Sequence, residues 1–146
     1  MSGDEALRLA VYFHVGRRDR LGSPAWRHNE RVQRAVAQVT DDPTALAAAA
    51  LHDVIEVGAG TAEEMTQFDV PPAVVRLVED ITLRPSEAPN LYAFRVLGAG
   101  PFAREIKIAD LRDRLEPVTA GLLSRSDYHR MKPRWEAALA VLLDGA

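Results

Sequence analysis

Hydrophobic side chains recur every three or four residues along most of this chain, which is the spacing that one face of an α-helix requires. This periodicity predicts helices over residues 2–15, 24–39, 45–56, 71–81, 90–97, 102–115 and 127–143, with a further short helix after residue 61. Two of these segments begin with the capping-box spacing Ser/Thr-x-x-Glu, at Ser2 and at Thr61. No segment shows the sustained alternation of a β-strand. We therefore expect an all-α fold, a compact bundle of about seven to eight helices with short connections.

The composition narrows the class of protein. A length of 146 residues suits one domain, so we expect residues 1–146 to form a single unit. Hydrophobic residues make up 47% and charged residues 27%, which is the balance of an ordinary globular protein. The absence of cysteine excludes disulfides, thiol nucleophiles and Cys-type zinc sites.

The charge and the apolar runs limit the partners. A net charge of -3 offers no general attraction to DNA or RNA duplexes or to anionic lipid. No apolar run is long enough for a membrane span, and the first residues do not have the pattern of a signal peptide. We expect a cytoplasmic protein that binds neither nucleic-acid duplexes nor membranes, and the sequence does not indicate an oligomeric state.

Ligand-type side chains interrupt two of the predicted apolar helices. His52 and Asp53 are adjacent among Ala, Leu, Val and Ile, and Asp110 is flanked by Ile and Ala. A buried aspartate is costly unless it is paired or metal-bound. Neighbouring helical residues point about 100° apart, so a shared ion needs further ligands from other helices, and His28 and Asp110 are the natural donors. An aspartate that caps a helix or joins an ion pair is the alternative, and local sequence does not decide between the two.

Three blocks of the chain change this balance: RRDRLGSPAWRHNERV at residues 17–32, LHDVIE at 51–56 and AREIKIADLRDRL at 103–115. Together they resemble the HD-domain phosphohydrolases, and among these the hydrolase domain of the RelA/SpoT alarmone enzymes and their small stand-alone relatives. The His-Asp doublet alone is weak evidence, whereas its combination with an earlier His and a later Lys-Ile-Ala-Asp block is specific. The resemblance implies one divalent metal ion bound by His28, His52, Asp53 and Asp110. Mixed imidazole and carboxylate ligands suit manganese, iron or zinc, and related hydrolases indicate manganese.

The resemblance also implies a catalytic carboxylate. Glu56 lies four residues after His52, and on a helix it would share the same face and could orient or deprotonate the attacking water. In alarmone hydrolases the motif continues with a second carboxylate, whereas this chain has Val57. The loss of one acid/base group typically costs about a hundredfold to ten-thousandfold in rate. The alternative for Glu56 is a solvated carboxylate at a helix end.

Four basic residues are candidates for substrate binding. Arg17 and Arg18 correspond, in this resemblance, to a basic pair that contacts the nucleotide, where a guanidinium stacks on a base or bonds to phosphate. A solvated basic loop is the alternative for this pair. Lys107 could meet a phosphate or support the metal ligands. Arg114 stands where the family usually has Asn, so base or ribose recognition is expected to differ.

The sequence thus leads to a first hypothesis and two alternatives. The first is a metal-dependent phosphohydrolase that acts on a nucleotide phosphate or pyrophosphate, with the 3'-pyrophosphate of ppGpp as a candidate substrate. The second is a weakly active or inactive metal-dependent nucleotide-binding sensor module, which Val57 and Arg114 favour. The third is a purely structural helical protein. His14 and His129 match no motif position and receive no role, and the aromatic residues are interpreted as packing residues.

Overall fold

The computed structural model describes residues 1–19, 22–116 and 124–145, and over these ranges the fold is all-α, as predicted. The helices are α1 (Gly3–Phe13), α2 (Trp26–Ala37), α3 (Pro43–Leu51), α4 (Ala62–Gln67), α5 (Pro72–Asp80), α6 (Pro89–Gly98), α7 (Pro101–Leu115) and α9 (Arg125–Asp144). Extended pairing within the described ranges is limited to one isolated bridge between Arg18 and Pro24. None of the described helices is long and apolar enough to cross a membrane.

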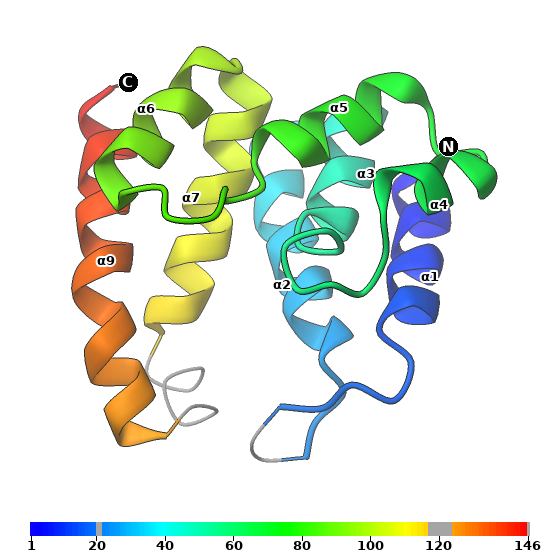
Figure 1. The fold of residues 1–146 in the computed structure, drawn as a ribbon. Helices are drawn as coiled ribbons and strands as arrows, with labels where there is room; N and C mark the ends of the chain where they lie inside the picture. The colour runs from blue at the N-terminus through cyan, green and yellow to red at the C-terminus, as the bar shows by residue number, and fades with distance from the viewer. Residues whose placement is uncertain (20–21, 117–123, 146) are drawn as a thin grey trace.

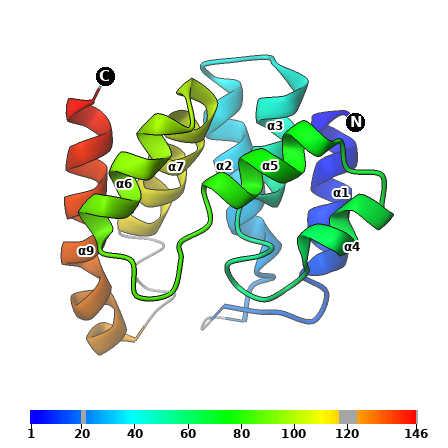
Figure 2. The same ribbon diagram turned by 45° about the horizontal axis from the view of Figure 1, so that its top comes forward.

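The helices form two groups that meet along α2 and α7. On one side, α3 packs against both α1 and α2, and α5 lies across α3. On the other side, α9 packs against α6 and α7 (Figure 1). The view in Figure 2 shows the same division, with α2 and α3 behind α5 and with α7 behind α6. Because α2 contacts α7, residues from the two halves of the sequence face one another at this junction.

Alanine makes the close packing around α3 feasible. Ala47, Ala48, Ala49 and Ala50 are fully buried, as is Leu51 at the end of the helix. Small side chains let the neighbouring backbones of α1 and α2 approach closely while apolar surface is removed from water. The residues that follow Leu51 therefore lie at the centre of the molecule, close to α2 and α7.

Of the helix boundaries that differ from the sequence-based prediction, two have a clear cause in the structure. The helix expected over residues 45–56 ends at Leu51, and irregular turns follow to Gly58, which has a φ of 71° that favours glycine. The amides of Ala59 and Gly60 both donate to the Val54 carbonyl, at 2.9 and 3.1 Å, and so close this turn. The second helix begins after Ala25, because Pro24 pairs with Arg18 instead of opening the helix.

The predicted helix starts at Ser2 and Thr61 are confirmed. Ser2 Oγ accepts the Glu5 amide and the Glu5 carboxylate accepts the Ser2 amide, which completes the capping box. Thr61 Oγ1 accepts the Glu64 amide at 3.1 Å. Such caps satisfy amides that have no partner within the helix.

Candidate metal centre

The centre of the molecule brings together side chains from three segments that are far apart in the sequence. His28 comes from α2, His52 follows directly after α3, and Asp110 comes from α7. The two Nε2 atoms lie 3.2 Å apart, and Asp110 Oδ1 lies 2.9 Å from His28 Nε2 and 3.4 Å from His52 Nε2. Asp110 is fully buried and His52 is nearly so. Three ligand-type atoms therefore converge on one point.

The hydrogen-bond partner of Nδ1 determines the tautomer of each histidine ring. His52 Nδ1 lies 2.8 Å from the Ala49 carbonyl, which can only accept, so Nδ1 carries the hydrogen. His28 Nδ1 lies 2.7 Å from Asp113 Oδ2, the usual arrangement of a carboxylate behind a metal-binding histidine. In the neutral rings both Nε2 lone pairs then face each other and the Asp110 oxygen. Three converging acceptors fit a cation at their centre, since a cation satisfies all three.

Asp53, in the turn that follows α3, is the fourth member of this group. One ligand atom each from His28, His52 and Asp53 lies within 4.8 Å of the others, while Asp110 meets the same two histidines from α7. The four residues that the sequence analysis nominated as metal ligands are therefore neighbours in the structure.

Two cations hold the Asp110 carboxylate. Lys107 Nζ lies 2.6 Å from Oδ2 and Arg114 Nε lies 2.8 Å from Oδ1. Burial alone would raise the pKa of Asp110, but the charges of Arg114 and Lys107 outweigh burial and hold the pKa well below its usual value. The same pairing raises the pKa of Lys107 and of Arg114 despite their own burial. All three groups are therefore charged near neutral pH.

The carboxylates also act on His52. Burial by itself lowers the pKa of His52, but Asp53 and Asp110 outweigh burial and raise the pKa above its ordinary value. A proton and a metal ion are alternatives at an imidazole nitrogen, because only the deprotonated nitrogen binds metal. Metal binding at this group is therefore expected to release protons and to strengthen as the pH rises.

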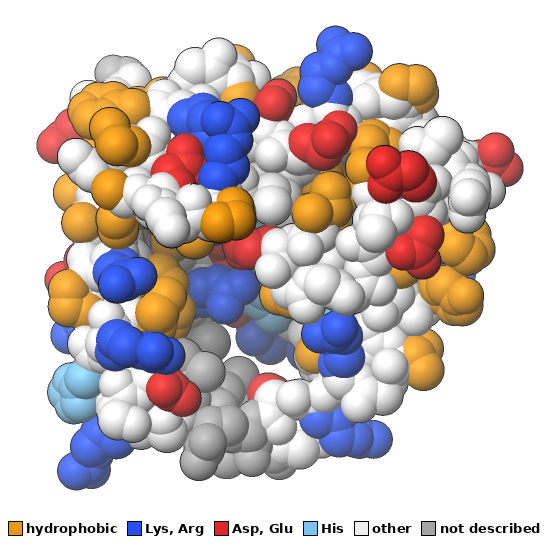
Figure 3. Space-filling view, in the orientation of Figure 1, with side chains coloured by type: hydrophobic (Ala, Val, Ile, Leu, Met, Phe, Trp, Pro, Cys, Tyr) orange, Lys and Arg blue, Asp and Glu red, His pale blue; other side chains and the backbone are white. Residues whose placement is uncertain are grey.

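The proposed catalytic and substrate-binding residues Glu56, Lys107 and Arg114 line one cavity of about 290 Å³. Val57 and, from α9, Trp135 also line this cavity. The Leu83 amide donates to Glu56 Oε1 at 2.9 Å, which holds this carboxylate at the cavity. Figure 3 shows a hollow on this face of the molecule, in which Lys or Arg side chains and a histidine are visible.

Arg17 and Arg18 are not among the residues that line this cavity. Arg17 donates to the carbonyls of Val57 and Gly58 at 3.1 and 3.2 Å, and Arg18 donates to the Gly22 carbonyl at 2.7 Å. Both arginines line a separate cavity of about 210 Å³. In this structure Arg17 fixes the turn that follows Asp53, and the role of the pair in substrate binding stays a prediction.

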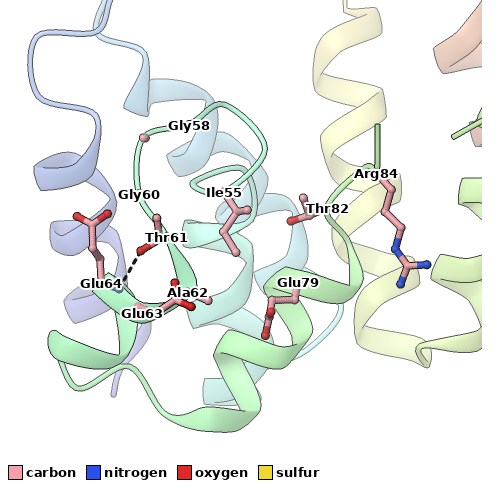
Figure 4. Close-up of a pocket in the computed structure, with 11 residues that line it drawn as sticks. Ile55, Gly58, Gly60, Thr61, Ala62, Glu63, Glu64, Glu79, Thr82 and Arg84 are labelled. Atoms are coloured by element: carbon pink, nitrogen blue, oxygen red, sulfur yellow. Dashed lines mark hydrogen bonds between the residues drawn. The ribbon is translucent and has the colours of Figure 1, made fainter. Parts of the chain in front are cut away.

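A larger cavity, of about 540 Å³, lies away from the histidines between the loop at residues 58–64 and α5 (Figure 4). Its polar lining consists mainly of Glu63, Glu64 and Glu79, together with Arg84. No histidine is among the residues that line it, and over the described part of the chain the one group of side chains close enough to share a metal ion is that of His28, His52 and Asp53. Volume therefore does not identify the reactive site in this molecule.

Four residues near the metal centre were missed by the sequence analysis. Asp113 accepts a hydrogen bond from His28. Arg31 donates to the same carboxylate, from Nε to Oδ1 at 2.7 Å and from Nη2 to Oδ2 at 3.0 Å. His14 Nε2 lies 3.2 Å from Asp53 Oδ1, and Asn29 Nδ2 donates to that oxygen at 2.7 Å. A signal was available only for Asp113, because it follows Asp110 by three residues and shares a helical face with it.

Comparison with known proteins identifies the fold. No family model matches the chain, and no curated protein matches its sequence. Among solved structures, one described as "A metazoan ortholog of SpoT hydrolyzes ppGpp and plays a role in starvation responses" matches with a TM-score of 0.75 and 23% sequence identity. The match covers 96% of this chain and 84% of that chain. This chain therefore has the fold of that protein, and this fold is all-α, as the sequence predicts.

Proposed function

We propose that this chain is a metal-dependent phosphohydrolase that removes a phosphate or pyrophosphate from a nucleotide, with the 3'-pyrophosphate of ppGpp as the first candidate. The observation that carries the proposal is the convergence of His28 Nε2, His52 Nε2 and Asp110 Oδ1 while both Nδ1 atoms are already hydrogen-bonded. The fold adds support, because the matched metazoan protein is described as hydrolysing ppGpp.

In this proposal His28, His52, Asp53 and Asp110 hold one divalent cation, with manganese as the first candidate and iron or zinc as alternatives. Such an ion supplies a Lewis acid for a phosphoryl oxygen and lowers the pKa of bound water. The protein's own part is to fix the ligands. Asp113 and the Ala49 carbonyl hold the two rings, while Lys107 and Arg114 hold Asp110.

In this proposal Glu56 takes the proton of the attacking water, and Lys107 and Arg114 bind the phosphate oxygens of the substrate. Glu56 faces the same cavity as the two cations and would accept a proton from the attacking water. The raised pKa values of Lys107 and Arg114 keep both side chains cationic, as binding of phosphate oxygens requires. Arg17 and Arg18 lie outside this cavity, and for them we retain a contact with the base or a distal phosphate as a prediction.

A metal-dependent nucleotide-binding sensor with weak or no activity is the second candidate. Val57 favours it, because this side chain is 40% exposed on the cavity wall where related hydrolases carry a carboxylate. A valine neither accepts a proton nor orients water. Binding would then survive without efficient turnover.

The test is phosphate and pyrophosphate release from a nucleotide panel that includes ppGpp, with manganese and with chelator. We expect manganese-dependent release that Glu56→Gln lowers by at least about a hundredfold. Glu79→Gln is the matched control, because Glu79 lines the other cavity. Nucleotide binding without release from any substrate would favour the sensor. Absence of both metal and nucleotide binding would contradict both candidates.

A further inference from the structure

The aspartate that follows His52 is held on one oxygen by two buried side chains from different helices. Asn29 on α2 donates to Asp53 Oδ1 at 2.7 Å, and His14 at the end of α1 contacts the same oxygen at 3.2 Å. His14 is 2% exposed and Asn29 is fully buried. Among the described residues no donor reaches Asp53 Oδ2.

We infer that His14 is a positioning residue that holds Asp53 Oδ1 and thereby presents Oδ2 to the metal ion. The inference rests on the metal site of the proposed function. It gives α1 a part in the centre, although none of the four proposed ligands comes from that helix. Because the chain around Asp53 is an irregular turn, the backbone alone does not fix the direction of this carboxylate.

The unsatisfied atoms nearby indicate that packing does not explain His14. Its Nδ1 is buried without a hydrogen-bond partner, and its contact with Asp53 is the one side-chain hydrogen bond recorded for it over the described residues. A buried polar atom without a partner is costly, and an apolar ring at this position would avoid that cost. The benefit of histidine must therefore come through Asp53. The same argument does not single out Asn29, because Asn29 also donates to the Ala50 carbonyl at 2.9 Å.

Without this donor the Asp53 carboxylate is expected to rotate, so that either of its oxygens can face the metal ion. Loss of a group that hydrogen-bonds to a metal ligand typically lowers metal affinity by about tenfold to a hundredfold. The polar contact, and not the ring itself, is then the property that matters. A side chain that donates a hydrogen bond at the same place should preserve binding.

The experiment compares His14→Phe, which keeps a flat ring without a donor, with His14→Gln, whose amide can donate to Asp53. His129→Phe and His129→Gln are the matched controls, because His129 is exposed on α9. Metal-free protein is titrated with Co²⁺ while the visible absorption of the bound ion is recorded, and Mn²⁺ affinity is measured by calorimetry. Melting curves in chelator show whether each variant folds, and His14→Leu replaces His14→Phe if the latter does not.

We expect the donor-free variant to bind Co²⁺ about tenfold to a hundredfold more weakly and with an altered absorption spectrum. His14→Gln should retain most of the affinity and the wild-type spectrum, and the two controls should match the wild type. Unchanged affinity and spectrum in the donor-free variant, with a wild type that binds metal, would overturn the positioning role alone. A wild type that binds neither Co²⁺ nor Mn²⁺ would instead contradict the proposed function.

Discussion

Removal of the Asp110 charge should destabilise the protein even when no metal is present. Asp110 is fully buried and contacts Lys107 Nζ at 2.6 Å and Arg114 Nε at 2.8 Å. In Asp110→Asn the amide has nearly the same shape, but its NH2 group must face one of the two cations. Breaking one side of a buried ion pair typically costs about 3 to 5 kcal/mol, because the remaining charge is left without a partner. For a domain of this size we expect the melting temperature in chelator to fall by about 10 °C.

The assay is urea unfolding in chelator, so that loss of a metal ligand does not contribute. Asp127→Asn is the control, since that side chain is 47% exposed and its ion pair with Arg130 is a surface contact. The double variant Lys107→Met with Asp110→Asn should lose less stability than the two single changes together, because one unpaired cation is absent. If Asp110→Asn is as stable as the wild type in chelator, the description of Asp110 as an electrostatic anchor is wrong.

Three further outcomes follow from the same contacts. The pKa of His52 is raised in the folded state, so protonated His52 stabilises the fold fully below the unfolded pKa of 6.5, and this stabilisation is lost as the pH rises through the folded pKa. The melting temperature in chelator should therefore fall as the pH rises above 6.5, while the increase in melting temperature on adding manganese becomes larger. Arg95→Lys should lower the free energy of unfolding by about 3 kcal/mol in urea titrations, since Arg95 bonds to Glu87 and to the carbonyls of Asp80 and Thr82; an unchanged midpoint would contradict this. Val57→Asp should raise manganese-dependent ppGpp hydrolysis by up to about a hundredfold at unchanged metal affinity, whereas wild-type turnover equal to that of enzymes with both carboxylates would show that Val57 matters little.

The periodic segments allowed most of the fold to be predicted. Hydrophobic spacing and the caps at Ser2 and Thr61 identified helices that the structure contains, because these signals are local. The end of α3 was mispredicted for the same reason. Residues 52–56 have helix-compatible side chains, and the turn there depends on the Val54 carbonyl and Gly58, together with Arg17, which donates to carbonyls about forty residues away.

The proposed metal ligands and the residues that orient them differ in how far the sequence could reveal them. His28, His52, Asp53 and Asp110 were predicted as metal ligands through a resemblance in three blocks. The structure brings their side chains together, and their binding of a metal stays a prediction. The contacts that orient them depend on tertiary packing. His14 reaches Asp53 across 39 positions, and no local pattern distinguishes it from a histidine in an ordinary helix.

The charges around the cavity indicate what kind of substrate it can take. In the proposed site two ligand carboxylates would balance one divalent cation. The cavity itself is lined by three cations, Lys107, Arg114 and Arg134, and by two carboxylates, Glu56 and Glu87, so positive charge is in excess. An anion is therefore favoured over a neutral or cationic ligand. Because Arg114 stands where the alarmone hydrolases that the sequence resembles usually have Asn, this excess is larger by one charge than their pattern implies. Arg114→Asn should consequently weaken binding of pyrophosphate-bearing nucleotides more than binding of the corresponding nucleosides, as calorimetry can measure, and equal losses for both would show that Arg114 contacts the nucleoside instead.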